Sequence, residues 1–441
     1  MTNTVNVRRI ETTSRRDVRT FIRVPFKLYH DCPQWVPPLV PGMRRTLDRE
    51  TFPIYQDVDA EFFVADRDGE VMGRIAVLDN HLYNDYHDTR TAFFYYFDVV
   101  DDSVVSDALF EAAFDWARGR GLTDVLGPKG LVRFDAHGLL VDGFEHRAAV
   151  GVPYNYPYYE RLVREAGFVK ELDYYSGYLS ADFEMPERLV RIAERVKERR
   201  GFSIKTFTSK DEIWSFLPQA HEIYLKAWKQ VPGYYPVSRA EITIMMERVI
   251  SVADPEMIKL VMKDDRPVGF VISYPDLAAG IQRCNGRLWP FGWLHLLWER
   301  KRTKWVTLNG VGLLPEYQGF GANAILYVEL AKTLREYGFE YGDYVQVAIQ
   351  GRMLDDVFRL PRSALRNGET VWLIDDQDQL AIRSVSIAWR DRDTVLVDGG
   401  LSDNDRVIVS DIATPVAGMA LRREGDLTVL TTTRLAEDER Q

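Results

Sequence analysis

A turn with two glycines separates a strand-like apolar segment from a helical pattern in LLPEYQGFGANAIL, residues 313–326. A strand that ends at Leu314 and a helix that begins near Gly321 leave free backbone N–H groups at the positive end of the helix dipole. Gly319 and Gly321 let the backbone bend and let an anion approach without an intervening Cβ atom. Gln318 offers a side-chain donor. The turn predicts a cradle for a pyrophosphate, and the competing interpretation is that its glycines serve turn geometry alone.

The same residues resemble the GNAT superfamily of acyl-CoA-dependent N-acyltransferases. That family carries Gln/Arg-x-x-Gly-x-Gly/Ala at the start of its central helix, and Gln318, Gly321 and Asn323 occupy those positions, with Asn323 departing from the usual Gly or Ala. The resemblance implies acetyl-CoA or another acyl-CoA, with the thioester carbonyl beside the backbone of 311–313, where an N–H would stabilise an oxyanion. The implied acyl-CoA contacts are Val311, Gly312, Leu313, Gln318, Gly319, Phe320, Gly321, Ala322 and Asn323.

Acylation of an amine also needs a base for the ammonium and an acid for the leaving thiolate. The resembled family often uses a carboxylate or water for the first and a tyrosine for the second. Glu316, beside the turn, is the carboxylate candidate, and Tyr344 is the tyrosine candidate, with Tyr341 close to it. A solvated turn residue and ordinary core or rim aromatics remain the competing interpretations.

Two segments of the chain repeat one order of strands and helices. The segments at 60–78 and 257–274 each read as a hairpin with a tight charged turn. A strand follows each hairpin, at 92–100 and 305–314, and then an amphipathic helix, at 105–121 and 323–338, that ends at a glycine. The pattern predicts an α/β fold with two mixed-sheet units in tandem, and the resemblance implies that both units are GNAT-like, over about residues 8–350.

The two units differ in the chemistry of their turns. Asp101 and Asp102 stand where the first unit would need a cradle, and two carboxylates repel a pyrophosphate, so residues 1–184 are expected to be scaffold or substrate-side wall. A helical connector is expected at 185–202, and the unit with the acyl-CoA cradle at 203–350. The second unit lacks the helix and strands that should end it, which predicts an open sheet edge.

From about residue 343 the pattern changes to short β-runs separated by Asp, Gly and Asn, and no lysine follows Lys332. This predicts a small all-β module at 351–425 and a tail at 426–441. Its runs VFRLPRSALRNGETVWLIDDQDQLAIRSVSI and VLVDGGLSDNDRVIVSD resemble the C-terminal part of RND efflux periplasmic adaptor (membrane-fusion) subunits. The resemblance implies a protein partner for this module, no catalysis and a gene fusion. Our hypothesis is that the module caps the open edge by strand addition.

The composition and net charge exclude some classes of binding partner. A net charge of −10 argues against a general nucleic-acid binder, and two distant cysteines without a ligand cluster argue against a metal site. The N-terminal segment has no signal-like apolar stretch, which predicts a cytoplasmic location. The segment LWPFGWLHLLW at 288–298 is too short for a transmembrane segment. It reads as a buried or partner-facing loop and helix start, with membrane-surface contact as the alternative.

Three functions follow from these observations. The leading hypothesis is an N-acyltransferase that moves an acetyl or acyl group from acyl-CoA to an unknown amine. The second is a non-catalytic binding or adaptor protein, in which the two units are scaffold and the β module docks a partner. The third is an inactive gene fusion.

Overall fold

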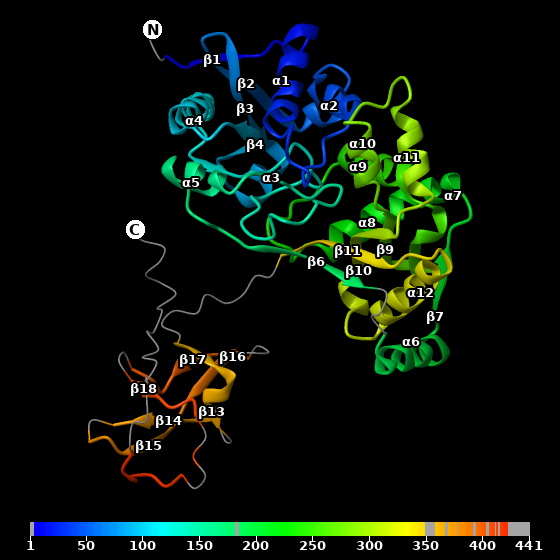
Figure 1. The fold of residues 1–441 in the computed structure, drawn as a ribbon. Helices are drawn as coiled ribbons and strands as arrows, with labels where there is room; N and C mark the ends of the chain where they lie inside the picture. The colour runs from blue at the N-terminus through cyan, green and yellow to red at the C-terminus, as the bar shows by residue number, and fades with distance from the viewer. Residues whose placement is uncertain are drawn as a thin grey trace. The chain divides into compact units, whose positions relative to one another are not determined.

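The computed structural model describes residues 4–180, 185–348, 358–366, 369–375, 377–390, 394–402, 405–410, 412 and 415–421. The chain divides into two compact units, Met1–Ile349 and Gln350–Gln441 (Figure 1). Both predicted α/β repeats lie in the first unit and the all-β module lies in the second, so the predicted fold class is confirmed.

The first sheet has the strand order β1-β2-β3-β4-β5. Its strands are β1 Asn6–Arg9, β2 Val58–Arg67, β3 Glu70–Asn80, β4 Thr91–Val99 and β5 Asp124–Leu126. Successive residues of β2 point to opposite faces. Phe62 and Val64 pack with α1 (Arg15–Leu28) and α2 (Val40–Leu47), whereas Phe63 and Ala65 pack with α4 (Ser103–Arg118) and α5 (Tyr158–Glu165). Helices therefore cover both faces.

The second sheet has the order β6-β11-β10-β9-β8-β7. Its strands are β6 Tyr174–Ser180, β7 Phe202–Thr206, β8 Ile258–Lys263, β9 Arg266–Pro275, β10 Trp305–Leu313 and β11 Tyr341–Ala348. Helices α8 (Leu217–Ala227) and α9 (Arg239–Val252) cover one face and α12 (Ala322–Glu336) the other (Figure 1). The remaining helices of this half are α7 Lys210–Ser215, α10 Ala278–Arg283 and α11 Gly292–Arg300.

Strand β6 corrects the expectation of an open edge. It follows α5 of the first half in sequence, yet it pairs antiparallel with β11, from Tyr341↔Ser180 to Ala348↔Tyr174. The edge that we expected to be open is therefore closed from within the same unit. The predicted 1–184 segment thus contributes a strand to the second sheet.

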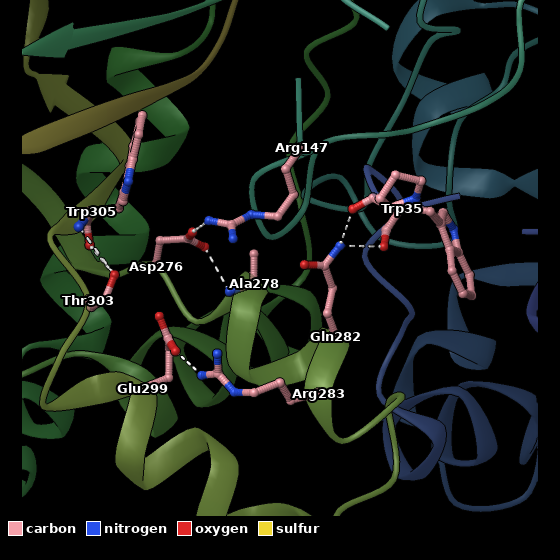
Figure 2. A network of polar contacts seen from close by, with 10 residues as sticks. Trp35, Arg147, Asp276, Ala278, Gln282, Arg283, Glu299, Thr303 and Trp305 are labelled. Carbon is pink, nitrogen blue, oxygen red and sulfur yellow. Dashed lines mark hydrogen bonds and ion pairs between the residues drawn. The ribbon is translucent and has the colours of Figure 1, made fainter. Parts of the chain in front are cut away.

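The predicted connector is also part of the second half. Its helix, α6 Glu187–Arg200, buries Ala193 and Val196 in the same core cluster as α12 and β8. On the other side, Gln282 of α10 donates to the carbonyl oxygens of Pro33 and Trp35 at 2.8 Å each (Figure 2). The two repeats are therefore interlocked by a shared strand and by polar contacts.

The second compact unit is built from short strands. Strands β12 Phe358–Pro361, β17 Thr394–Gly399 and β16 Ser386–Arg390 form one sheet, and β13 Leu365–Arg366, β14 Thr370–Ile374 and β15 Leu380–Ser384 form another, with β18 Arg406–Val407 beside β14. Leu360, Val371, Leu373, Val395 and Val397 make its core. Across the described residues of the whole chain, no helix is long and apolar enough to cross a membrane.

Candidate functional site

The glycine turn has the geometry of an uncapped helix start. Gly319 (φ 77°) and Gly321 (φ 86°) are left-handed, and Gly321 is the N-cap of α12 without a side-chain hydrogen bond to the first helical amides. A Cβ atom at Gly319 would meet nothing within 4 Å. The Gln318 amide donates to the Leu313 carbonyl at 3.0 Å, so it fixes the turn. The open face of Gly319 and the uncapped amides suit an anion.

Helix α6 supplies a cation to this turn that sequence reasoning missed. The Arg200 guanidinium lies 5.2 Å from the centroid of the exposed Phe320 ring, and its Nη1 donates to the Phe320 carbonyl at 3.3 Å. Gly321 has a second role here, because a Cβ atom there would lie 2.8 Å from Ile192 and 2.9 Å from Val196. Gly319 thus faces open space, whereas Gly321 is a packing contact between α12 and α6.

Strand β10 has one free edge just before the turn. Its pairing with β9 continues to Leu313↔Gly269, with a register shift between Leu308 and Gly310. Its parallel pairing with β11 ends at Leu308↔Tyr344. Among the described strands, none pairs with the β11-facing edge of β10 from 309 to 313. Because the backbone groups of a strand alternate in direction and the Leu314 N–H bonds to Val268 of β9, the groups of Gly312 face β9. The N–H groups of Val311 and Leu313 therefore face the free edge, where the Leu313 carbonyl already accepts from Gln318.

In the first half, the chain's own side chains bind the backbone groups at the corresponding helix start and strand end. The Asp102 carboxylate caps α4, accepting from Val104 N at 3.0 Å and Val105 N at 3.3 Å. Val99, at the end of β4, donates its N–H to Tyr159 Oη and accepts from Tyr158 Oη. The helix start and the strand end are thus both satisfied internally.

Trp228, at the end of α8, lies against the glycines of β10. A Cβ atom at Gly312 would lie 3.2 Å from the Trp228 Nε1 atom and 3.0 Å from the Phe270 ring. The Trp228 ring lies 5.2 Å from Tyr224 and 6.0 Å from Phe134, centroid to centroid. Phe134 belongs to the first half, so aromatic side chains of both halves flank the free edge of β10.

Three buried polar atoms lie in the same region as these aromatic rings. Arg133 Nε, Tyr224 Oη and Glu241 Oε2 have no hydrogen-bond partner in the part of the chain that the structure describes. Glu241 lies in the first turn of α9, and its Oε1 accepts from Tyr235 Oη at 2.8 Å and from the Arg133 backbone N–H. Burial raises the pKa of Glu241 to about 7. Orphaned buried polar atoms point to a bound ligand or water.

Two further titratable groups line the junction of the halves. Burial lowers the pKa of Lys129 to about 7, and its Nζ lies 4.3 Å from the Tyr83 ring centroid and 4.5 Å from that of Phe93. Burial lowers the pKa of His137 to about 4, so this imidazole is neutral at neutral pH. Of the two, only Lys129 has a pKa shifted toward neutrality, as suits a group that transfers protons.

The predicted acid and base candidates lie elsewhere. Glu316 sits in the exposed 3₁₀ turn Pro315–Tyr317, where no described side chain forms a hydrogen bond with it. The backbone of Tyr344 pairs with Leu308, and its side chain lies outside the described residues. The Tyr341 ring stacks on Trp305 at 4.6 Å. Within the described residues, no group of three or more metal-binding side chains is present.

Comparison with protein families identifies the C-terminal module. Residues 360–414 match the family described as RND MFPs, C-terminal permuted SH3 domain. This match confirms the predicted adaptor-like character of the all-β module.

Curated relatives cover most of the chain. It is 28% identical over 346 residues to Protein YghO of Escherichia coli (strain K12), spanning 76% of this chain and 86% of YghO. It is 27% identical over 332 residues to the bacterial ceramide synthase of Caulobacter vibrioides (strain NA1000 / CB15N), spanning 74% and 85% of the two chains.

Two solved structures align with most of the chain at low sequence identity. A tandem GNAT protein from the clavulanic acid biosynthesis pathway is 14% identical with a TM-score of 0.46, covering 79% of this chain and 91% of that one. A GCN5-related N-acetyltransferase from Sphaerobacter thermophilus is 15% identical with a TM-score of 0.41, covering 89% and 94%. The family match thus gives the chain the RND adaptor-like C-terminal domain that the sequence predicted.

Proposed function

We propose that residues 1–349 form an N-acyltransferase that moves an acyl group from acyl-CoA to a primary amine. The observation that carries this proposal is that a free strand edge is followed directly in the chain by an open helix start. The free edge of β10 ends at Leu313, and the open, uncapped start of α12 begins at Gly321. A ligand that pairs with the edge and ends in a pyrophosphate fits both features at once.

Different residues of the chain would hold different parts of the acyl-CoA. Backbone amides of Ala322 and Asn323, reached across Gly319, would hold the pyrophosphate, and Arg200 adds a positive charge beside it. The backbone at 311–313 would orient the thioester. Because Gln318 is bound to Leu313, its role is to fix the turn that joins the two parts.

The acceptor amine would enter from the junction of the halves, beside Trp228 and Phe134. In the transfer, the amine nitrogen forms a C–N bond with the acyl carbon as the C–S bond breaks, and the second proton that the nitrogen loses replaces the one given to the thiolate. We assign Glu241 as the group that takes the ammonium proton, because its pKa of about 7 balances proton uptake and release. Tyr224, with its unpartnered Oη, is our candidate donor to the leaving thiolate. These assignments replace Glu316 and Tyr344 as our candidates.

The likeness to a ceramide synthase supports a class of acceptor. A ceramide is an amino alcohol that carries an acyl group on nitrogen, so forming one from acyl-CoA is an N-acylation. We therefore propose a lipid amine as the acceptor of this chain. The use of acyl-CoA favours a cytoplasmic site of reaction.

The first experiment is calorimetric titration of the full chain with acetyl-CoA and with a long-chain acyl-CoA. The test variant is Gly319→Asp, which puts a carboxylate on the open face of the turn. The matched control is Gly338→Asp, because Gly338 follows the other end of α12 with φ 73° and also has no atom within 4 Å of a Cβ position. Both variants carry the same backbone strain and the same added charge.

We expect micromolar binding by the wild type and by Gly338→Asp, and binding at least tenfold weaker by Gly319→Asp. Equal binding by all three proteins would remove the turn from the site. A well-folded wild type that binds no acyl-CoA would favour the second function, a binding or adaptor protein. The observation that favours that alternative is the match of residues 360–414 to an RND adaptor domain.

A further inference from the structure

The segment before and within α11 exposes an unusual amount of apolar surface. Six of the 17 large apolar side chains that are exposed among the described residues fall within ten consecutive positions. Their exposed fractions run from 44% to 84%. They are Trp289, Phe291, Trp293, Leu294, Leu297 and Trp298. The expectation that this segment is buried is therefore wrong, and the partner-facing and membrane-surface interpretations remain.

Helix α11 is held firmly by its inner side. Gly280 of α10 packs so closely that a Cβ atom there would lie 2.9 Å from the Glu299 Cβ and 3.1 Å from the His295 carbonyl oxygen. Figure 2 shows the ion pair between Arg283 of α10 and Glu299 of α11, and a second ion pair joins Arg300 to Asp254. The helix is thus fixed in place, and exposure of its apolar side chains is a property of the folded chain.

The exposed residues share one face of this fixed helix. Trp293, Leu294, Leu297 and Trp298 recur at intervals of one, three and one residues, which keeps them within one face of an α-helix. Trp289 and Phe291 extend the same apolar surface, the α11 face, from the preceding loop. A nine-residue helix is roughly 14 Å long, so it suits the surface of a bilayer and not its interior.

The α11 face is bordered by positive charge in a chain whose net charge is −10. Its border cations are Arg287, Lys301 and Arg302, whereas Arg300 and Lys304 are already paired with Asp254 and Glu340. The single acidic residue between 285 and 304 is Glu299, which is already paired with Arg283. The guanidinium groups of Arg283 and Arg302 lie within 4.6 Å of the Trp298 ring centroid. The surface therefore combines indole rings, leucines and cations.

We propose that the α11 face docks this chain on the surface of a bilayer that contains anionic lipid. Tryptophan and phenylalanine side chains enter the boundary between headgroups and acyl chains, and lysine and arginine contact anionic headgroups. A second copy of the chain fits this surface less well, because a two-fold contact would bring two sets of border cations together. A bilayer offers apolar depth and negative charge together.

The test is co-sedimentation of the full chain with vesicles, without any acyl-CoA. Vesicles of phosphatidylcholine mixed with phosphatidylglycerol are compared with vesicles of phosphatidylcholine alone. We expect the wild type to sediment with the mixed vesicles, less so at high salt, and Leu294→Glu/Leu297→Glu to bind them at least tenfold more weakly. The matched control is Val104→Glu/Val141→Glu, which removes two equally exposed apolar residues elsewhere and adds the same charge.

A second variant separates docking from misfolding. Lys301→Glu/Arg302→Glu leaves the apolar residues in place and should abolish the preference for anionic vesicles. The proposal is overturned if the wild type does not sediment with mixed vesicles, or if the leucine variant binds them as well as the control. It is also overturned if light scattering finds a vesicle-free dimer that the leucine substitutions dissociate and no binding to vesicles. Failure here leaves the proposed acyl-CoA site untouched, because no acyl-CoA takes part in the test.

Discussion

At the scale of single residues, Glu241 is the most unusual group in the first compact unit. Its carboxyl is 1% exposed, and one oxygen has two donors while the other has none in the described chain. Burial without a cationic partner on Oε2 favours the neutral acid, which explains its raised pKa. An unpaired carboxyl at the junction of two halves costs stability, and such a cost is typical of functional sites.

This carboxyl should make stability depend on pH. The pKa of Glu241 is about 7 in the folded chain against 4.5 for the free side chain, so the folded state holds the proton more tightly. The stabilisation is complete below about pH 4.5 and is lost as the pH rises through 7, a change of up to about 3 kcal/mol. Glu241→Gln should therefore gain stability relative to the wild type as the pH rises. Urea unfolding on either side of this window measures the difference, and Glu316→Gln, at an exposed site, should show none.

The rate of acyl transfer should report on the same residue. In the wild type, kcat/KM should rise as the pH increases through about 7, where Glu241 loses its proton. In Glu241→Gln the rate should fall by about a hundredfold and the rise should disappear. A reduced rate that keeps the wild-type pH profile would contradict the assignment of Glu241 as the base.

A substitution at Tyr224 should affect thermal stability and catalytic rate in different directions. Its Oη forms no hydrogen bond of ordinary geometry in the described residues, although the Arg133 side chain lies beside it, so Tyr224→Phe removes a buried hydroxyl and keeps the ring contacts with Trp228 and Phe134. We expect unchanged or slightly higher thermal stability, because the desolvation cost disappears. The same variant should lower kcat by about tenfold or more. Unchanged kcat would exclude Tyr224 as the proton donor.

At the scale of elements, the pair β10–α12 and the pair β4–α4 follow one plan with opposite outcomes. In the first half, Asp102 and two tyrosines satisfy the helix start and the strand end. In the second half, Gly321 stands at the N-cap and the strand edge is free. The open edge and uncapped amides persist because α6 and α12 bury apolar surface around the turn, with Ile192 and Val196 against Gly321.

The two glycines of the turn should respond differently to alanine. Gly319→Ala adds only left-handed backbone strain, about 1 kcal/mol, since its Cβ meets nothing. Gly321→Ala adds the same strain and pushes a methyl group into Ile192 and Val196, for roughly 1–3 kcal/mol more. Chemical denaturation should show Gly321→Ala as clearly the less stable protein. Equal losses would mean that α6 does not pack on the turn.

At the scale of the whole molecule, the first repeat contributes a strand to the sheet of the second. Strand β6 follows the first repeat and completes the sheet of the second, and α10 bonds back to the 33–35 segment of the first. The acceptor side of the candidate site also draws on both repeats, with Arg133 and Phe134 from one and Tyr224 and Glu241 from the other. The two repeats therefore form one structural body, and the proposed site draws on both.

The position of β6 in the second sheet predicts which shortened chains fold. A chain of residues 1–349 keeps every strand of both sheets and should retain the thermal transition and acyl-CoA binding of that part of the full chain. A chain of residues 185–349 loses β6, which exposes the edge of β11, and should aggregate or unfold at lower temperature. Light scattering and calorimetry distinguish the two. A stable, soluble 185–349 fragment would contradict the interlocked arrangement.

The sequence by itself determined the repeated order of strands and helices, the all-β module and the position of the glycine turn. These follow from periodicity, from turn residues such as Asp68-Gly69, and from the switch to short β-runs after residue 343, all of which act over a few neighbouring positions. Only the tertiary structure decided the rest. The pairing of β6 with β11 and the burial of Glu241 beside Arg133 join residues that lie more than 100 positions apart. Local patterns carry no information on such contacts, because strand pairing and the desolvation of a carboxyl depend on which distant surface covers it.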